Sequence, residues 1–106
     1  MHFQIEILTE EDGKKPFIEW IENLQLKDQA RINNRIARIQ SGNFGDTKSV
    51  GDGVFELRFF FGSGFRVYYA KRNDKIVIIL SGGDKSSQDK DIKKAKTLWN
   101  DYIAKD

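Results

Sequence analysis

The chain has 106 residues, of which 39% are hydrophobic and 32% are charged, with a formal net charge of +2. This length allows one domain, residues 1–106, with a sizeable core. The lack of cysteine excludes disulfides and thiolate metal sites, and no apolar run approaches the roughly 20 residues that span a bilayer. No secretory signal pattern opens the sequence, so we expect a cytoplasmic protein with no membrane partner.

The first forty residues predict one strand followed by two helices. Phe3, Ile5 and Ile7 alternate with polar residues, which is typical of a strand. Pro16 begins a helical pattern, at a position where its missing N–H group costs little. A second helix is expected over residues 27–40, where isoleucines recur at helical spacing.

A basic stripe accompanies the second predicted helix. Arg31, Arg35 and Arg38 follow one another at helical spacing and form a face that can bind a phosphate backbone. Such a face is more often only the solvated side of an amphipathic helix. The polar, glycine-rich stretch 42–53 is expected to be an irregular connection, and it contains Lys48.

Residues 54–81 predict a three-stranded antiparallel meander. Three runs of aromatic and β-branched residues are separated by two short turns. Because side chains alternate along a strand, Glu56 and Arg58 share the polar face, and Arg66 joins them from the next strand. Two guanidinium groups on one sheet face suit a phosphate or oxyanion site. The alternative is that each arginine is a solvated strand residue, paired with Glu56.

The third run of the meander and the last helix complete the expected fold. Residues 76–80 are all apolar, which predicts a strand buried on both faces. A final helix is expected after Ser86 or Ser87, either of which suits an N-cap. The predicted order is β–α–α–β–β–β–α, a small single-domain α+β fold with a mainly antiparallel sheet and helices packed on it.

The sequence offers no pattern for a metal or cofactor site. His2 is the only histidine, so zinc and haem sites are not expected, and no cofactor is predicted. Residues 82–87 lie between a predicted strand and a helix, as a phosphate loop would. They lack the Gly-x-x-x-x-Gly-Lys spacing of such a loop, which leaves only a weak anion-binding signal.

Three fragments together resemble a known family. They read VFELR at residues 54–58, GFRVYY at 64–69 and LSGGDKSSQDKDIKKA at 80–95. This combination looks like the RelE/ParE superfamily of toxins from bacterial toxin–antitoxin modules. More narrowly, it resembles the HigB-like, phage-related addiction module killer proteins. The similarity covers nearly the whole chain, including the order of its elements.

The resemblance implies a fold and an activity. It implies a RelE-like fold and a ribosome-dependent, metal-independent mRNA endoribonuclease that inhibits translation. Carried over position by position, it implies catalytic roles for Arg58, Arg66 and Lys85. Glu56 departs from the family, since RelE has lysine there, and it is either a base or an ion-pair partner of Arg58.

RNA binding and partners follow from the same hypothesis. We expect RNA contacts from the basic stripe, Arg31, Arg35 and Arg38, and from Lys48. The expected partners are the ribosome, mRNA and a cognate antitoxin of the helix-turn-helix DNA-binding type. Two alternatives stay open: a ParE-like poison of DNA gyrase without nuclease activity, and an inactive antitoxin-binding module.

Overall fold

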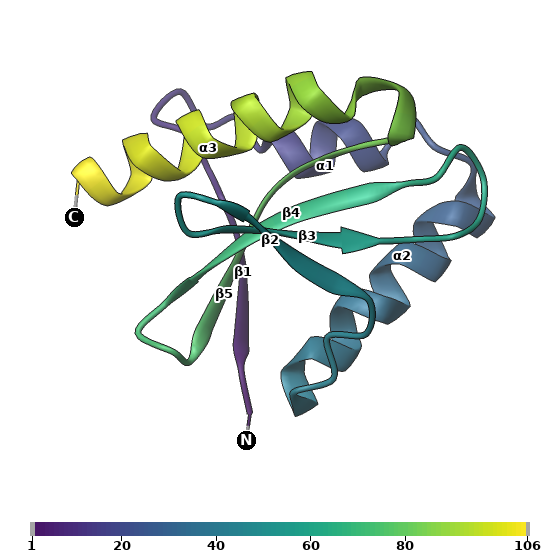
Figure 1. Ribbon diagram of the computed structural model, residues 1–106, viewed down its shortest axis with the longest axis horizontal. Coiled ribbons are helices and arrows are strands. Elements are labelled where there is room, and N and C mark those ends of the chain that lie inside the picture. The colour runs from purple at the N-terminus through teal and green to yellow at the C-terminus, as the bar shows by residue number, and fades with distance from the viewer. Residues whose placement is uncertain (1, 106) are drawn as a thin grey trace.

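The predicted meander lies at the centre of a five-stranded sheet with helices on both faces (Figure 1). The computed structural model describes residues 2–105. Its elements are β1 (Gln4–Ile7), α1 (Pro16–Ile21), α2 (Leu26–Arg38), β2 (Thr47–Gly51), β3 (Val54–Arg58), β4 (Arg66–Arg72), β5 (Ile76–Gly83) and α3 (Gln88–Ala104). Short 3-10 turns occupy Ile39–Ser41 and Lys85–Ser87. The fold is therefore the expected small α+β domain.

The strands are arranged in the order β1-β5-β4-β3-β2. β3, β4 and β5 pair as an antiparallel meander, as predicted, while β1 pairs with β5 in parallel. The turn between β4 and β5 contains Asn73 and Asp74 with positive φ angles of 58° and 59°, a geometry that suits a tight hairpin. β5 lies inside the sheet, between β1 and β4, and is buried on both faces, as its apolar run at residues 76–80 indicates.

One expectation about the backbone is wrong, because residues 47–51 form strand β2 and not an irregular connection. β2 pairs with β3 through a tight turn in which Asp52 and Gly53 have positive φ angles of 56° and 80°. Asp-Gly is a strong short-range signal for a hairpin. The hydroxyl of Thr47 adds a hydrogen bond to the Glu56 carbonyl at 3.0 Å. Lys48 therefore lies on a strand.

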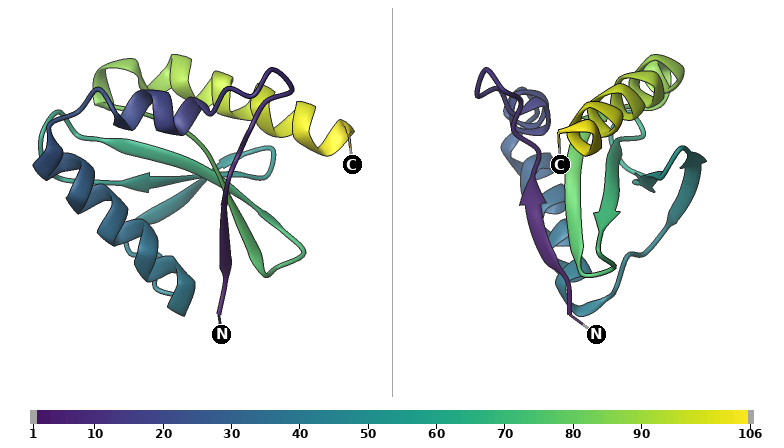
Figure 2. Two further views of the ribbon diagram at one scale, coloured as in Figure 1. Left: turned by 180° about the vertical axis from the view of Figure 1, so that it is seen from behind. Right: turned by 90° about the vertical axis from the view of Figure 1, so that its left-hand side faces the viewer.

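The two faces of the sheet carry separate apolar clusters. Side chains of α1 and α2 pack on one face against Leu57, Val67 and Ile79, and α3 packs on the other against Tyr68 and Leu80. Figure 2 shows α1 and α2 on the side of the sheet opposite to α3. Within residues 2–105, no helix combines the length and apolar character that a membrane crossing requires.

Candidate functional site

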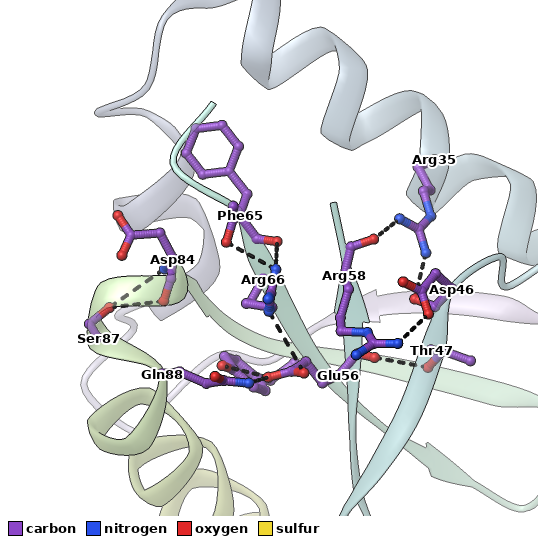
Figure 3. A network of polar contacts seen from close by, with 12 residues as sticks. Arg35, Asp46, Thr47, Glu56, Arg58, Phe65, Arg66, Asp84, Ser87 and Gln88 are labelled. Carbon is purple, nitrogen blue, oxygen red and sulfur yellow. Dashed lines mark hydrogen bonds and ion pairs between the residues drawn. The ribbon is translucent and has the colours of Figure 1, made fainter. Parts of the chain in front are cut away.

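Arg58 and Arg66 occupy directly opposite positions on β3 and β4. Their side chains leave the sheet on the face that carries α3, while the intervening Leu57 and Val67 enter the core on the other face. Neither arginine belongs to an apolar cluster. Strand alternation thus brings the two side chains to neighbouring positions on one face, with Arg66 next to the turn that leads into α3 and the Arg58 guanidinium turned toward Asp46 (Figure 3).

The Arg66 guanidinium is held by neighbouring groups, and the side chain is only 11% exposed. Its Nη1 donates to the carbonyls of Gly64 at 3.1 Å and Phe65 at 3.2 Å. Its Nε lies 3.8 Å from Oε1 of Glu56. Backbone contacts on one side and a carboxylate on the other limit the positions that this guanidinium can adopt.

Glu56 is fully buried and has polar partners of its own. Its Oε2 accepts hydrogen bonds from the Tyr68 hydroxyl at 3.1 Å and from Nε2 of Gln88 at 2.8 Å. Burial and, second, the charge of Glu56 raise the pKa of Tyr68, so its hydroxyl stays protonated and donates. Glu56 is therefore placed to hold Arg66, and its carboxylate is not open to a solvent-borne substrate.

Arg58 pairs with Asp46, a residue that the sequence analysis did not single out. Nη2 of Arg58 donates to Oδ1 of Asp46 at 2.9 Å, in place of the expected salt bridge between Arg58 and Glu56. This hydrogen bond lowers the pKa of the Asp46 carboxyl. The two side chains are 35% and 31% exposed, so the pair lies at the edge of solvent. Asp46 could have been anticipated only if β2 had been predicted.

Lys85 stands beside Arg66, at the start of the turn before α3. A Cβ atom built on Gly64 would lie 3.2 Å from the Lys85 Cβ and 3.8 Å from Arg66 Nη1, so the base of the Lys85 side chain and the Arg66 guanidinium both flank this glycine. Asp84 fixes the turn, because its carboxylate accepts from the Ser86 backbone N–H at 2.9 Å and from the Ser63 hydroxyl at 3.0 Å. Lys85 itself is exposed.

The four residues expected to bind RNA are distributed over two elements. Arg31 and Arg38 are exposed on α2, and Lys48 is exposed on β2, directly opposite Glu56. Arg35 is half-buried and donates hydrogen bonds to the backbone carbonyls of residues 44, 46 and 58. Its guanidinium thus ties α2 to the strand ends, and burial lowers its pKa.

The arrangement can bind and stabilise a negatively charged group. Arg58 and Arg66 present two oriented guanidinium groups, and Lys85 adds a cation that is free to reach solvent. Across residues 2–105, no group of three or more His, Cys, Asp or Glu side chains is placed to hold a metal ion. The chemistry that these residues offer is therefore charge stabilisation and proton donation.

Comparison with known proteins places the chain in a family. A family model described as "Phage derived protein Gp49-like (DUF891)" matches residues 19–100. The chain is also 58% identical over 83 residues to an "Uncharacterized protein" of Haemophilus influenzae, a match that covers 77% of this chain and 84% of that protein. The matched region runs from α1 into α3 and contains every candidate site residue. The chain belongs to the Gp49-like family of phage-derived proteins.

Proposed function

We propose that the protein is the toxin of a toxin–antitoxin module and that it cleaves mRNA on the ribosome without a metal ion. The observation that carries this proposal is the juxtaposition of Arg58, Arg66 and Lys85 on one sheet face. The family supports a toxin, and this cationic face supports a phosphodiester substrate. A ribosomal target would place the activity in the cytoplasm.

Cleavage of RNA by its own 2′-hydroxyl makes three chemical demands. The hydroxyl must lose a proton, the phosphorane must be stabilised, and the departing 5′-oxygen must gain a proton. Arg66 and Arg58 would bind the non-bridging oxygens and stabilise their growing charge. Lys85, exposed beside them, would donate the proton or bind a further phosphate oxygen. The ribosome would align the 2′-hydroxyl for attack, and its proton would pass to solvent water as the bond between phosphorus and the 5′-oxygen breaks.

Glu56 acts in this proposal as a positioning residue and not as the base. Its carboxylate is 0% exposed and holds hydrogen bonds from Tyr68 and Gln88, so it does not touch the RNA. Its negative charge lies on the inner side of Arg66. Nη1 of Arg66 is held by the Gly64 and Phe65 carbonyls, so Nη2 is the nitrogen that would bind the phosphate.

The test is translation-dependent cleavage by the wild type and by Arg66→Ala, Arg66→Lys and Lys48→Ala, with mRNA 5′ ends mapped after induction. Loss of one charge-stabilising donor costs roughly two to three orders of magnitude in rate, which is the fall expected for Arg66→Ala. Lys48 lies exposed on β2, so Lys48→Ala should have a small effect. Arg66→Lys should keep little activity if the planar fork is required.

Two outcomes of this experiment would contradict the proposal. Full cleavage by a folded Arg66→Ala protein would show that Arg66 has no catalytic role. Growth arrest with intact mRNA and altered DNA supercoiling would identify the protein as a gyrase poison. A cognate antitoxin, encoded next to the toxin, is the expected partner in either case, and under the nuclease proposal it should screen Arg58, Arg66 and Lys85.

A further inference from the structure

A second cationic surface lies on the opposite side of the sheet from the Arg58–Arg66 site. It is a groove of about 400 Å³ between α2 and the end of β3, lined by Arg31, Asn34, Arg35, Arg38 and residues 59–61. We call it the α2 groove. Its lining contains three arginines and no acidic side chain among the residues that the structure describes. An occupant of this groove should therefore carry negative charge.

Phe60 is the most unusual feature of the α2 groove. It is 82% exposed, although a phenylalanine at the end of a strand usually finds cover. Phe59 is only 2% exposed and belongs to the core, and Phe61 is half-buried under the guanidinium of Arg31, 3.6 Å from Cζ to the ring centre. One aromatic ring thus stands free beside cations, as in surfaces that stack nucleic-acid bases.

Two of the three arginines are free to bind a ligand. Arg31 and Arg38 are seven residues apart, two helical turns, so they lie on the same side of α2. Both are exposed, and neither has an ion pair with any residue in the range 2–105. Arg35, between them, is committed to backbone carbonyls. Arg31 and Arg38 can each bind a phosphate with a planar fork.

We propose that the α2 groove binds the single-stranded RNA that flanks the cleaved bond, with a base stacked on Phe60 and phosphates on Arg31 and Arg38. The groove adjoins the Arg58–Arg66 site, because Arg35 in its lining donates a hydrogen bond to the Arg58 carbonyl. An RNA strand that passes the end of β3 can reach both. This inference rests on the proposed function and adds where its substrate is held.

A strand of RNA fits the groove better than an acidic protein segment does. Stable protein interfaces have an apolar core and bury about 800 Å² on each partner. Among the described residues that line the groove, Phe60 is the one large apolar side chain that is mostly exposed. Base stacking needs only one such ring, and charge supplies the remaining affinity.

The test is equilibrium binding of a fluorescein-labelled decauridine whose 2′-O-methyl groups prevent cleavage, measured by anisotropy. Phe60→Ala should weaken binding about tenfold, within the range known for loss of one stacked base, and Phe60→Trp should restore it. Leu26→Ala is the matched control, since Leu26 is also 82% exposed but lies outside the groove. Its affinity should equal that of the wild type.

The charge contribution is tested separately through salt. Each phosphate contact on a single strand contributes about 0.7 to the slope of log K against log salt, so Arg31→Gln with Arg38→Gln should lower that slope by about 1.4. Lys93→Gln with Lys94→Gln, which removes the same two positive charges from exposed positions on α3, is the control for net charge. Equal slopes for the double variant and its control would overturn the phosphate contacts.

Several results would overturn the proposal outright. These are no binding of the oligonucleotide by the wild type, wild-type affinity in Phe60→Ala, or full rescue by the non-aromatic Phe60→Leu. Equal affinity for an oligoglutamate decapeptide, with the same response to the variants, would show a general anion site and not an RNA site. The readout does not depend on cleavage, so a protein that binds RNA in this groove but cuts none would refute only the nuclease proposal.

Discussion

Oε1 of Glu56 and Nε of Arg66 face each other at 3.8 Å, and neither atom has a hydrogen-bond partner in the described structure. The pair is held by charge across β3 and β4 and not by a direct hydrogen bond. Because Glu56 is fully buried, its charge is weakly screened and acts strongly on Arg66. The Glu56–Arg66 pair is therefore expected to stabilise the fold and to fix the position of the Arg66 guanidinium.

The first prediction concerns the charge of Glu56. Glu56→Gln keeps the shape of the side chain but leaves Arg66 largely buried without its counter-charge. Breaking a buried pair in this way costs about 3 kcal/mol of unfolding free energy, measured by urea denaturation. Glu6→Gln is the control, since it breaks the exposed Arg72–Glu6 pair at 3.2 Å and should cost less than about 1 kcal/mol. Equal losses would show that burial does not strengthen the Glu56 pair.

The second prediction separates two buried tyrosines on neighbouring positions of β4. Tyr68 donates to the carboxylate of Glu56 at 3.1 Å, whereas the Tyr69 hydroxyl shares a hydrogen bond with the Thr47 hydroxyl at 2.8 Å. Hydrogen bonds to charged groups are the stronger kind, so Tyr68→Phe should cost about 2 kcal/mol and Tyr69→Phe about 1 kcal/mol. Calorimetric unfolding of both variants measures the difference. A larger loss of unfolding free energy for Tyr69→Phe than for Tyr68→Phe would mean that the hydrogen bond from Tyr68 to Glu56 contributes little to stability.

The third prediction is a pH dependence that arises from Asp46. The hydrogen bond from Arg58 lowers the pKa of Asp46 in the folded state below its ordinary value. Its stabilising contribution is therefore fully present above the ordinary pKa and is lost as the pH falls through the lowered folded value. Asp46→Asn removes this contribution, so the unfolding free energies of variant and wild type should converge toward low pH. Urea titrations from neutral to strongly acidic pH measure it; a constant gap would contradict the assignment.

The fourth prediction tests the close approach of α1 to β5 at Gly82. A Cβ atom at this position would lie 2.2 Å from Cε3 of Trp20, so Gly82→Ala must displace the indole ring. Overpacking of this kind costs about 1–3 kcal/mol. Ser81→Ala next to it is the control, because the buried Ser81 hydroxyl has no partner among the described residues and its removal should cost little. Thermal unfolding of both variants shows whether Gly82 is required for packing.

The meander could be predicted because two features of its sequence agree: the alternation of apolar and polar residues, and the short turns between the strands. Period-two alternation separates Leu57 and Val67 from Arg58 and Arg66, and a one-residue shift in register would reverse every side chain. The arginine pair follows from that alternation alone. β2 was missed because its sequence, TKSVG, mixes Thr and Val with Lys and Gly, which are depleted in strands, and its structure depends on pairing with β3.

The partners of the site residues could not be predicted from sequence. Asp46 reaches Arg58 only because β2 lies beside β3, and Gln88 reaches Glu56 only because α3 starts on the same face. The stripe of Arg31, Arg35 and Arg38 is uniform in sequence, yet only Arg35 turns toward the backbone. Such distinctions depend on contacts between residues far apart in the chain, which periodicity does not contain.

The order of strands also determines when the sheet can close while the chain is being synthesised. β1 pairs with β5, which lies much later in the chain, so residues 4–7 have no strand partner until residues 76–79 are made. Gln88 and Lys85 follow later still. Closing such a distant pairing is a late event in folding. A nascent chain therefore lacks both the finished sheet and the groups around Arg66 until residues 76–88 have been made.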